Sequence, residues 1–313
     1  MATYRAHALK LHTTGTSAVV LRDIISQALQ IDPEVRAEVT AENTSPDHVA
    51  QVARKLVHNW ATYDLVQFLD NVGVTGLCIT ADETHPGVVG YLQKCDDCGV
   101  PASGSVHRSL TYTLGLVVPR RLSCDNRGDA RIDFDLIILG DGSADPVTIA
   151  DNVALPSITA SPARFTLGPV KLKNVAFMEY SSLEIDFGNN VTTRGVESDI
   201  DDTHIEEKTH APKITLTGID PAWFSASKIP IGGAVVANST DYIYLRKRST
   251  AASGFVGDAT AEHIKFTLAG FASVTQALRA EMTRVSETQI VITGAKDASG
   301  NMPIIVDTTA ALP

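Results

Sequence analysis

The sequence contains little cysteine and no long apolar run. Its 313 residues include four cysteines, Cys78, Cys95, Cys98 and Cys124. Disulfide-dependent secreted domains carry more cysteine in a shorter chain, so we expect reduced thiols in a protein made in a cytosol. The N-terminus lacks the apolar segment of a secretion signal, and no run approaches the roughly 18 apolar residues of a membrane helix. We therefore expect a soluble protein without membrane contact.

Positive charge is also in short supply. The chain has 36 acidic and 26 basic residues and a formal net charge of −10. The only basic clusters are short, Arg120-Arg121 and Arg246-Lys247-Arg248. A protein that grips nucleic acid by neutralising phosphates is basic at least locally. The balance therefore argues against tight nucleic-acid binding and favours solubility.

Recognisable catalytic motifs are absent as well. The sequence has no Gly-x-Ser-x-Gly, no His-Glu-x-x-His and no phosphate-binding Gly-x-x-x-x-Gly-Lys-Ser, each of which places reactive groups at a fixed spacing. We predict that the chain is not an enzyme, has no catalytic residue and binds no cofactor. Triads assembled from distant residues remain open at this point.

Cys95-Asp96-Asp97-Cys98 is the sharpest local motif. Two thiolates at this spacing can bind one edge of a tetrahedral zinc, and His107 and Cys124 are the candidates for the remaining ligands. A second Cys-x-x-Cys is missing, and the acidic pair between the thiols raises their pKa and opposes redox chemistry. We predict a loop with two free thiols and no metal, with zinc as the alternative.

An acidic run lies between Glu197 and Glu207. Its carboxylates could bind a hard cation such as calcium, but the EF-hand spacing and its glycine are missing. Carboxylates this close repel one another, so we expect a loop that extends into water. The acidic residues are Glu197, Asp199, Asp201, Asp202, Glu206 and Glu207.

Alternation of apolar and polar residues with period two dominates the pattern and predicts half-buried strands. Such strands separated by Gly, Asn, Asp and Ser turns are typical of antiparallel sandwiches or barrels. Strands are predicted over 131–136, 182–187, 213–217 and 264–268. Helices are predicted over 48–56 after Asp47, over 66–70 after Asp64 and over 274–282 after Ser273. A hairpin is predicted over 288–308.

A segment rich in proline, Asp151 to Pro169, divides the chain almost in half. We predict two tandem antiparallel β domains, 1–157 and 158–313, with a few short helices. The halves share fragments: 8–11 resembles 170–172, and 128–134 resembles 258–266. Duplication and chance similarity both explain these fragments.

The whole pattern resembles a tailed-bacteriophage tail tube protein, with either a single or a duplicated tube domain. Each half has an early polar excursion, 32–47 and 188–211, followed by an aromatic segment and an Ile-x-Phe-x-Leu strand. Residues 95–112 lack a counterpart in the second half and are interpreted as an insertion.

The resemblance implies a virion structural protein that self-assembles into stacked rings, a trimer with pseudo-sixfold symmetry if the domain is duplicated. Sheets would join side by side around a lumen through which DNA passes without specific binding. The acidic run 197–207 would be an inter-subunit contact arm, and neighbouring tail proteins would be further partners. The inward face is expected to be rich in Asp and Glu, and the site of action is the tail, assembled in the host cytoplasm.

Three alternatives stay open. The chain could be another ring protein of the tail, such as a baseplate hub or distal tail protein. It could be a two-domain carbohydrate-binding or adhesion module, with Trp60, Trp223 and Tyr242 as stacking platforms, although core packing is the simpler role for the tryptophans. It could also be an enzyme that uses zinc at Cys95 and Cys98.

Overall fold

The computed structural model spans the chain and describes residues 3–12, 18–38, 48–81, 87–158, 160–172, 175–177, 179–196, 199–218, 241–250, 254–281, 284–297 and 299–313. For residues 33–38, 48–53, 175, 271–281 and 284–287 only the backbone is described. The described chain is mainly β, with several antiparallel sheets that do not close into a barrel and one helix. The predicted fold class is therefore confirmed.

The large sheet has nine strands. Its order is β19 (Gly270–Glu281), β20 (Arg284–Ala295), β16 (Lys213–Gly218), β13 (Tyr180–Asp186), β8 (Leu114–Asp125), β9 (Arg131–Leu139), β4 (His48–Thr62) and β3 (Ile24–Glu38), with β5 (Leu77–Thr80) paired to β8 beside this path. It runs through both halves of the chain.

The first small sheet has the order β10 (Val147–Val153), β7 (His107–Tyr112), β6 (Val88–Cys95), β1 (Thr3–Leu11) and β2 (Val19–Leu21). The second small sheet has the order β12 (Val175–Phe177), β11 (Phe165–Leu172), β17 (Tyr242–Lys247), β18 (His263–Leu268) and β21 (Ile304–Ala310). A two-stranded ribbon, β14 (Asn189–Arg194) and β15 (His204–His210), and the helix α1 (Leu65–Asn71) complete the described elements.

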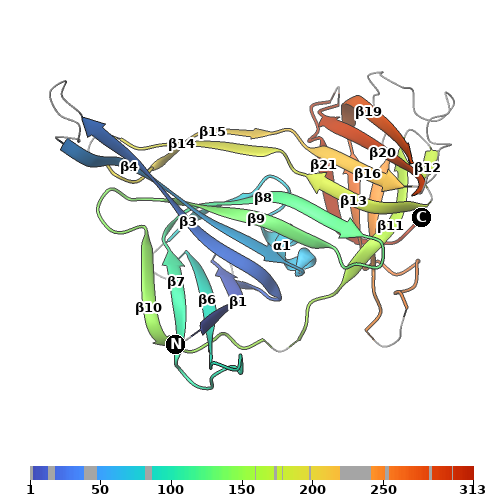
Figure 1. Ribbon diagram of the computed structural model, residues 1–313. Helices are drawn as coiled ribbons and strands as arrows, with labels where there is room; N and C mark the ends of the chain where they lie inside the picture. The colour runs from blue at the N-terminus through green and yellow to red at the C-terminus, as the bar shows by residue number, and fades with distance from the viewer. Residues whose placement is uncertain are drawn as a thin grey trace.

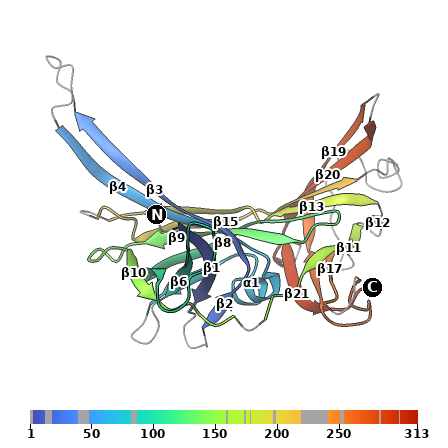
Figure 2. The same ribbon diagram turned by 60° about the horizontal axis from the view of Figure 1, so that its bottom comes forward.

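Both small sheets pack on the same side of the large sheet, so each half is a two-layer sandwich (Figures 1 and 2). Apolar side chains that alternate along the strands fill the space between the layers as one continuous core. Trp60 and Phe134 lie in its first half and Phe266 in its second, and all three are at most 2% exposed. Each such side chain contributes about 1.5–3 kcal/mol on burial.

The two halves have the same strand topology. The strand order of the first small sheet is β10, β7, β6, β1 and β2. The corresponding strands of the second small sheet follow in the same order, β21, β18, β17, β11 and β12. In the large sheet, β3, β4, β9 and β8 correspond in the same way to β13, β16, β20 and β19. The predicted division at residue 157 falls in the connection between β10 and β11 and remains a prediction.

Equivalent details accompany this topology. The backbone N–H of Lys94 donates to Nδ1 of buried His107 at 3.1 Å, and the N–H of Lys247 donates to Nδ1 of buried His263 at 3.0 Å. The bridge that follows each lysine joins Cys95 to Pro101 in one half and residues 248 and 255 in the other. The segment 95–112 therefore has a counterpart, and its interpretation as an insertion is wrong.

Several local predictions are confirmed. The four predicted strands correspond to β9, β13, β16 and β18. The helix after Asp64 is α1, although the Asp64 side chain makes no capping hydrogen bond. Its carboxylate instead accepts from Arg22 Nε at 2.9 Å. The similarity between 8–11 and 170–172 is also real, because these segments lie in the equivalent strands β1 and β11.

Other predictions are wrong. The predicted helix 48–56 lies in strand β4, and residues 274–281 of the predicted helix 274–282 lie in strand β19; residue 282 is outside the described residues. Pairing of β4 with β3 and of β19 with β20 outweighs the local helical spacing of apolar residues. The predicted hairpin 288–308 contains two strands of different sheets, β20 and β21. Segments 128–134 and 258–266 enter strands of different layers, β9 and β18, so they are not equivalents.

A buried polar group lies in the first sandwich. His58 is 0% exposed, and its ring nitrogens contact the Tyr112 hydroxyl and the Gln27 side-chain oxygen. Because the amide oxygen can only accept, Nε2 carries the proton and Nδ1 accepts from the tyrosine hydroxyl. Burial lowers the pKa of His58 to about 4, so the ring is neutral in the folded chain.

Candidate assembly interface

The junction between the halves is a strand pair within the large sheet. Strand β13 of the second half pairs antiparallel with β8 of the first, with Ile185 opposite Leu122 and Asp186 opposite Arg121. The ladder continues past β13, because the N–H of Phe187 donates to the Arg120 carbonyl at 2.9 Å. The sheet therefore crosses from one half to the other without a gap.

A ribbon arm, defined as β14, β15 and the described tip residues 195–196 and 199–203 between them, reaches from the second half across the first (Figure 1). Its root is Gly188, whose φ of +58° is readily adopted by glycine. The side chain of Asn189 fixes the root by donating to the carbonyls of Val74 at 2.9 Å and Pro119 at 2.8 Å. The arm is thus joined to the first half from its first residue.

The arm covers an apolar strip on β8 and β9. Val191 is 6% exposed and packs, with half-buried Ile205, on four side chains of these strands. The strip consists of Leu116, Val118, Ile137 and Leu139. The part of β8 and β9 under the arm is buried on both faces, and the unbroken apolar run 136–139 is the sequence signal for such burial. This signal was missed because the strands were predicted from strict alternation of apolar and polar residues.

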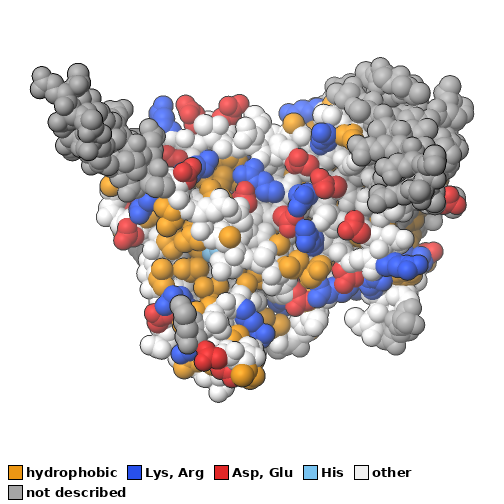
Figure 3. All heavy atoms as spheres, viewed as in Figure 1, with side chains coloured by type: hydrophobic (Ala, Val, Ile, Leu, Met, Phe, Trp, Pro, Cys, Tyr) orange, Lys and Arg blue, Asp and Glu red, His pale blue; other side chains and the backbone are white. Residues whose placement is uncertain are grey.

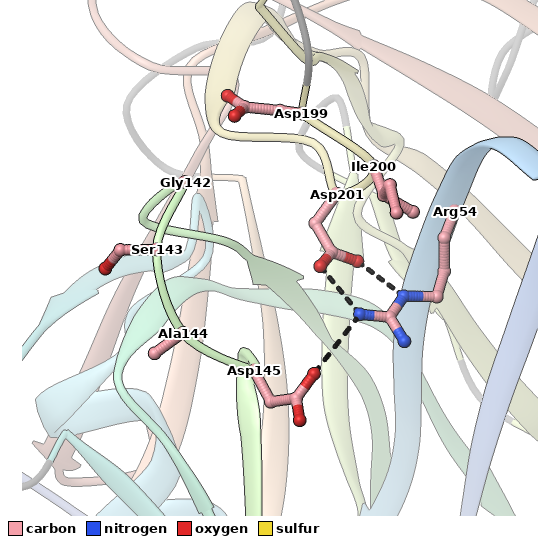
Figure 4. A pocket seen from close by; sticks show the side chains of 8 residues that line it. All are labelled: Arg54, Gly142, Ser143, Ala144, Asp145, Asp199, Ile200 and Asp201. Carbon is pink, nitrogen blue, oxygen red and sulfur yellow. Dashed lines mark hydrogen bonds and ion pairs between the residues drawn. The ribbon is translucent and has the colours of Figure 1, made fainter.

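The tip of the arm contacts β4 and the loop after β9 (Figure 4). Arg54 Nε and Nη2 each donate to one carboxylate oxygen of Asp201 at 2.7 Å, and the Arg54 N–H donates to the Ile200 carbonyl at 2.7 Å. Asp145 lies 3.8 Å from the same guanidinium. The hydrogen bond with Asp201 raises the pKa of Arg54. This bidentate ion pair lines an open pocket of about 370 Å³.

The predicted contact-arm residues lie in several environments. Asp199, Asp201 and Asp202 belong to the tip, and the Asp202 carbonyl accepts from the Gly140 N–H at 2.8 Å. Glu206 and Glu207 lie exposed on β15, and Glu197 lies outside the described residues. The tip contacts the chain's own first half instead of extending into water; a contact with another copy remains a prediction.

The structure does not bring the candidate zinc ligands together. Cys95 and Cys124 are buried in different sheets, Cys98 is exposed, and Nδ1 of His107 accepts from the backbone. Within the described ranges, no group of three or more His, Cys, Asp and Glu residues is placed to hold a metal ion. All four cysteines are free thiols.

The aromatic candidates do not form a binding platform in the described chain. Trp60 is 2% exposed and belongs to the core. Tyr242 packs edge-on against Tyr244 with ring centroids 5.1 Å apart. Trp223 lies outside the described residues.

The face of the large sheet opposite the small sheets carries charges of both signs, which Figure 3 shows interspersed over the middle of the molecule. Arg120 Nε lies 2.5 Å from Asp135, and Arg121 Nη2 lies 3.1 Å from Asp133. Arg131 lies 3.8 Å from Asp133. Each of these three arginines has a carboxylate partner. The predicted richness in Asp and Glu is therefore better described as a mixed, ion-paired surface along β8 and β9.

In the part of the chain that the structure describes, the two ends of the large sheet are open. Within the described residues, β3 pairs only with β4, and β19 pairs only with β20. Figure 2 shows both ends curving away from the small sheets, so the ion-paired face is concave. Unpaired strand edges template further pairing.

Apolar surface accompanies the β3 end. Ile31 on β3 and Ile149 on β10 are each 57% exposed. Together with Leu29, Leu56 and Val147 they line a shallow groove of about 220 Å³. Figure 3 shows hydrophobic side chains gathered on this side of the molecule.

Within the described part of the chain, no helix has the length and hydropathy required to span a membrane. No protein-family model and no curated protein sequence matches the chain. The function must therefore be argued from the geometry of this interface.

Proposed function

We propose that the chain is a structural subunit that assembles with copies of itself into rings, and that these rings stack into the tail tube of a tailed bacteriophage. The observation that carries the proposal is the relation between the two open ends of the large sheet. Strand β3 has the position in the first half that β13 has in the second, and β19 has the position of β8. Since β13 pairs with β8, the ends β3 and β19 are complementary between copies.

The curvature of the sheet supports a closed ring over an open filament. Both ends rise on the side of the ion-paired face, so repeated joining brings that face to the inside (Figure 2). With a tube domain in each half, three copies would close a ring with pseudo-sixfold symmetry. Heterologous contacts of this kind close when the rotation per copy divides a full turn.

The inner face of such a ring suits a conduit for DNA. Its Arg120 pairs with Asp135, Arg121 and Arg131 share Asp133, and Glu184 lies 3.8 Å from Arg121. Binding to DNA through phosphates requires basic groups that release counterions, and paired arginines on an acidic protein supply little of this. DNA would pass without specific binding, and the subunit would act in the virion tail after assembly in the host cytoplasm.

Negative-stain microscopy of the purified chain at high concentration tests the proposal. Rings or tubes with a central channel are expected. Particles that remain dispersed monomers at every concentration would contradict it and favour a binding module. Rings that occur once per virion would instead assign the chain to a baseplate hub or distal tail protein.

A further inference from the structure

We infer that neighbouring copies join by an antiparallel pair between β3 of one copy and β19 of the next, in the register of the internal β13–β8 pair. The inference rests on the proposed self-assembly and specifies its joint. In this register Ala28 lies opposite Arg279 of the next copy, Leu29 opposite Leu278, and Gln30 opposite Ala277.

The equivalence of β3 and β13 follows from their shared partners. Strand β3 pairs with β4, and β13 pairs with β16, and each pair has a register shift at the same place, after Ile24 and after Tyr180. Counting from these shifts makes Leu29 equivalent to Ile185 and Ile31 equivalent to Phe187.

The equivalence of β19 and β8 follows in the same way. Leu122 lies opposite residue 132 on β9, and Leu278 lies opposite residue 288 on β20. Residues 132 and 288 are themselves equivalent, because they pair with Thr62 of β4 and residue 218 of β16. Leu122 and Leu278 are therefore equivalent residues of the two halves. The internal pairing of Ile185 with Leu122 thus corresponds to a pairing of Leu29 with Leu278 between copies.

The burial of equivalent residues at the internal junction and at the open edge supports the inferred β3–β19 pairing. Ile185 and Phe187, which lie at the internal junction, are each 0% exposed. Their equivalents on the open edge differ, because Leu29 is half-buried and Ile31 is 57% exposed. An apolar pair that is exposed only where the junction lacks its second strand indicates a surface that a further copy covers. Covering this apolar surface removes it from water, which stabilises the joint.

The joint differs from the internal junction in its charges. Inside the chain Arg121 on β8 lies 3.8 Å from Glu184 on β13, whereas the equivalent positions between copies hold Ala277 and Ala28. The joint between copies therefore lacks this ion pair. Its association should depend less on salt concentration than a charge-paired joint would.

Disulfide trapping tests the register. In a background with the exposed thiols removed, Cys78→Ser and Cys98→Ser, we pair Ala28→Cys with Arg279→Cys in one chain. Opposite residues of an antiparallel pair lie about 4.5–5.5 Å apart, within disulfide range. Mild oxidation should give covalent multimers that end in a closed ring. The internal pair Glu184→Cys with Ser123→Cys is the matched control, because these residues are opposite within one chain and should form a bond without multimers.

An off-register pair, Gln30→Cys with Arg279→Cys, controls for random collision. Its diagonal separation of about 7–8 Å should make oxidation about tenfold slower or worse. Mixing the single variants Ala28→Cys and Arg279→Cys should give dimers only, because the joint is head to tail.

Ring assembly and register fail in distinguishable ways. Rings seen by microscopy without a disulfide between the cysteines at positions 28 and 279, or with faster formation of the off-register disulfide, would overturn the inferred joint. The proposed ring assembly would still stand in that case. Absence of both rings and bonds would overturn the proposed function as well. Self-coupling of the single Ala28→Cys variant would show a symmetric interface and would also reject the joint.

Discussion

The ion pair between Arg54 and Asp201 holds the ribbon arm on the first half, and a double-mutant cycle can measure it. Both hydrogen bonds are 2.7 Å long, and the side chains are 27% and 15% exposed. At about 4 Å between charge centres and an effective dielectric of about 20, the attraction is roughly 4 kcal/mol. Desolvation and side-chain ordering offset most of it, so we expect a coupling of about 1–2 kcal/mol.

The cycle uses Arg54→Leu, Asp201→Leu and the double variant, with the free energy of unfolding measured in urea at low protein concentration. Each single variant should lose about 2 kcal/mol, because the remaining charge keeps its partial burial without its partner. Arg194 and Glu206, on the same arm, lie 3.9 Å apart and are 69% and 54% exposed. Their coupling should stay below about 0.5 kcal/mol. An Arg54–Asp201 coupling no larger than this control would refute the reasoning.

Three further outcomes are expected. Above pH 6.5 the His58 ring is neutral in both the folded and the unfolded chain, and between pH 6.5 and about 4 only the unfolded chain takes up the proton. The free energy of unfolding should therefore fall with decreasing pH by up to about 3 kcal/mol. Urea unfolding at a series of pH values measures this fall, and its absence would show that burial does not lower the pKa of His58. Gly188→Ala should loosen the arm, because a Cβ there would lie 1.9 Å from a backbone oxygen at a φ of +58°. Hydrogen exchange of the backbone amides on β14 and β15 should become faster. Unchanged exchange would show that Gly188 does not fix the position of the arm. Gly90→Ala should cost about 1–3 kcal/mol, since its Cβ would meet the Trp60 ring at 2.9 Å, whereas Gly254→Ala, with open space, should be neutral in the same thermal melts.

A fifth prediction concerns the open edge, for which the chain provides a matched pair of sites. Ile31 on β3 and Val100 in the loop after β6 are each 57% exposed. Replacement of either by Asp should leave the single chain folded, because neither side chain is in the core. Only Ile31→Asp should prevent self-association in sedimentation velocity, since it places a charge in the apolar joint. Equal association by both variants would argue that β3 is not at the joint.

The sequence predicted the strands whose alternation is strict, because one face of each is buried by a single neighbouring layer. The segments 48–56 and 274–282 were predicted as helices from the spacing of their apolar residues, whereas their described residues form parts of β4 and β19, which pair with the neighbouring strands β3 and β20. The sequence did not reveal the role of His107 either. His107 and His263 each accept a hydrogen bond from a backbone N–H at equivalent places in the two halves, which identifies His107 as a structural residue. The acidic run was predicted to extend into water or to contact another subunit, and its contact with the chain's own first half was missed because Arg54 is 147 residues from Asp201. Long-range contacts of this kind depend on topology, which composition and periodicity do not specify.

Native mass spectrometry of the unmodified chain over a range of concentrations tests self-assembly most directly. Closure through the edges of the large sheet predicts a species of three subunits and its stacked multiples, with intermediates rare once rings close. A spectrum that contains only the 33.3 kDa monomer at the highest concentration, or an even-numbered series built on a symmetric dimer, would contradict it.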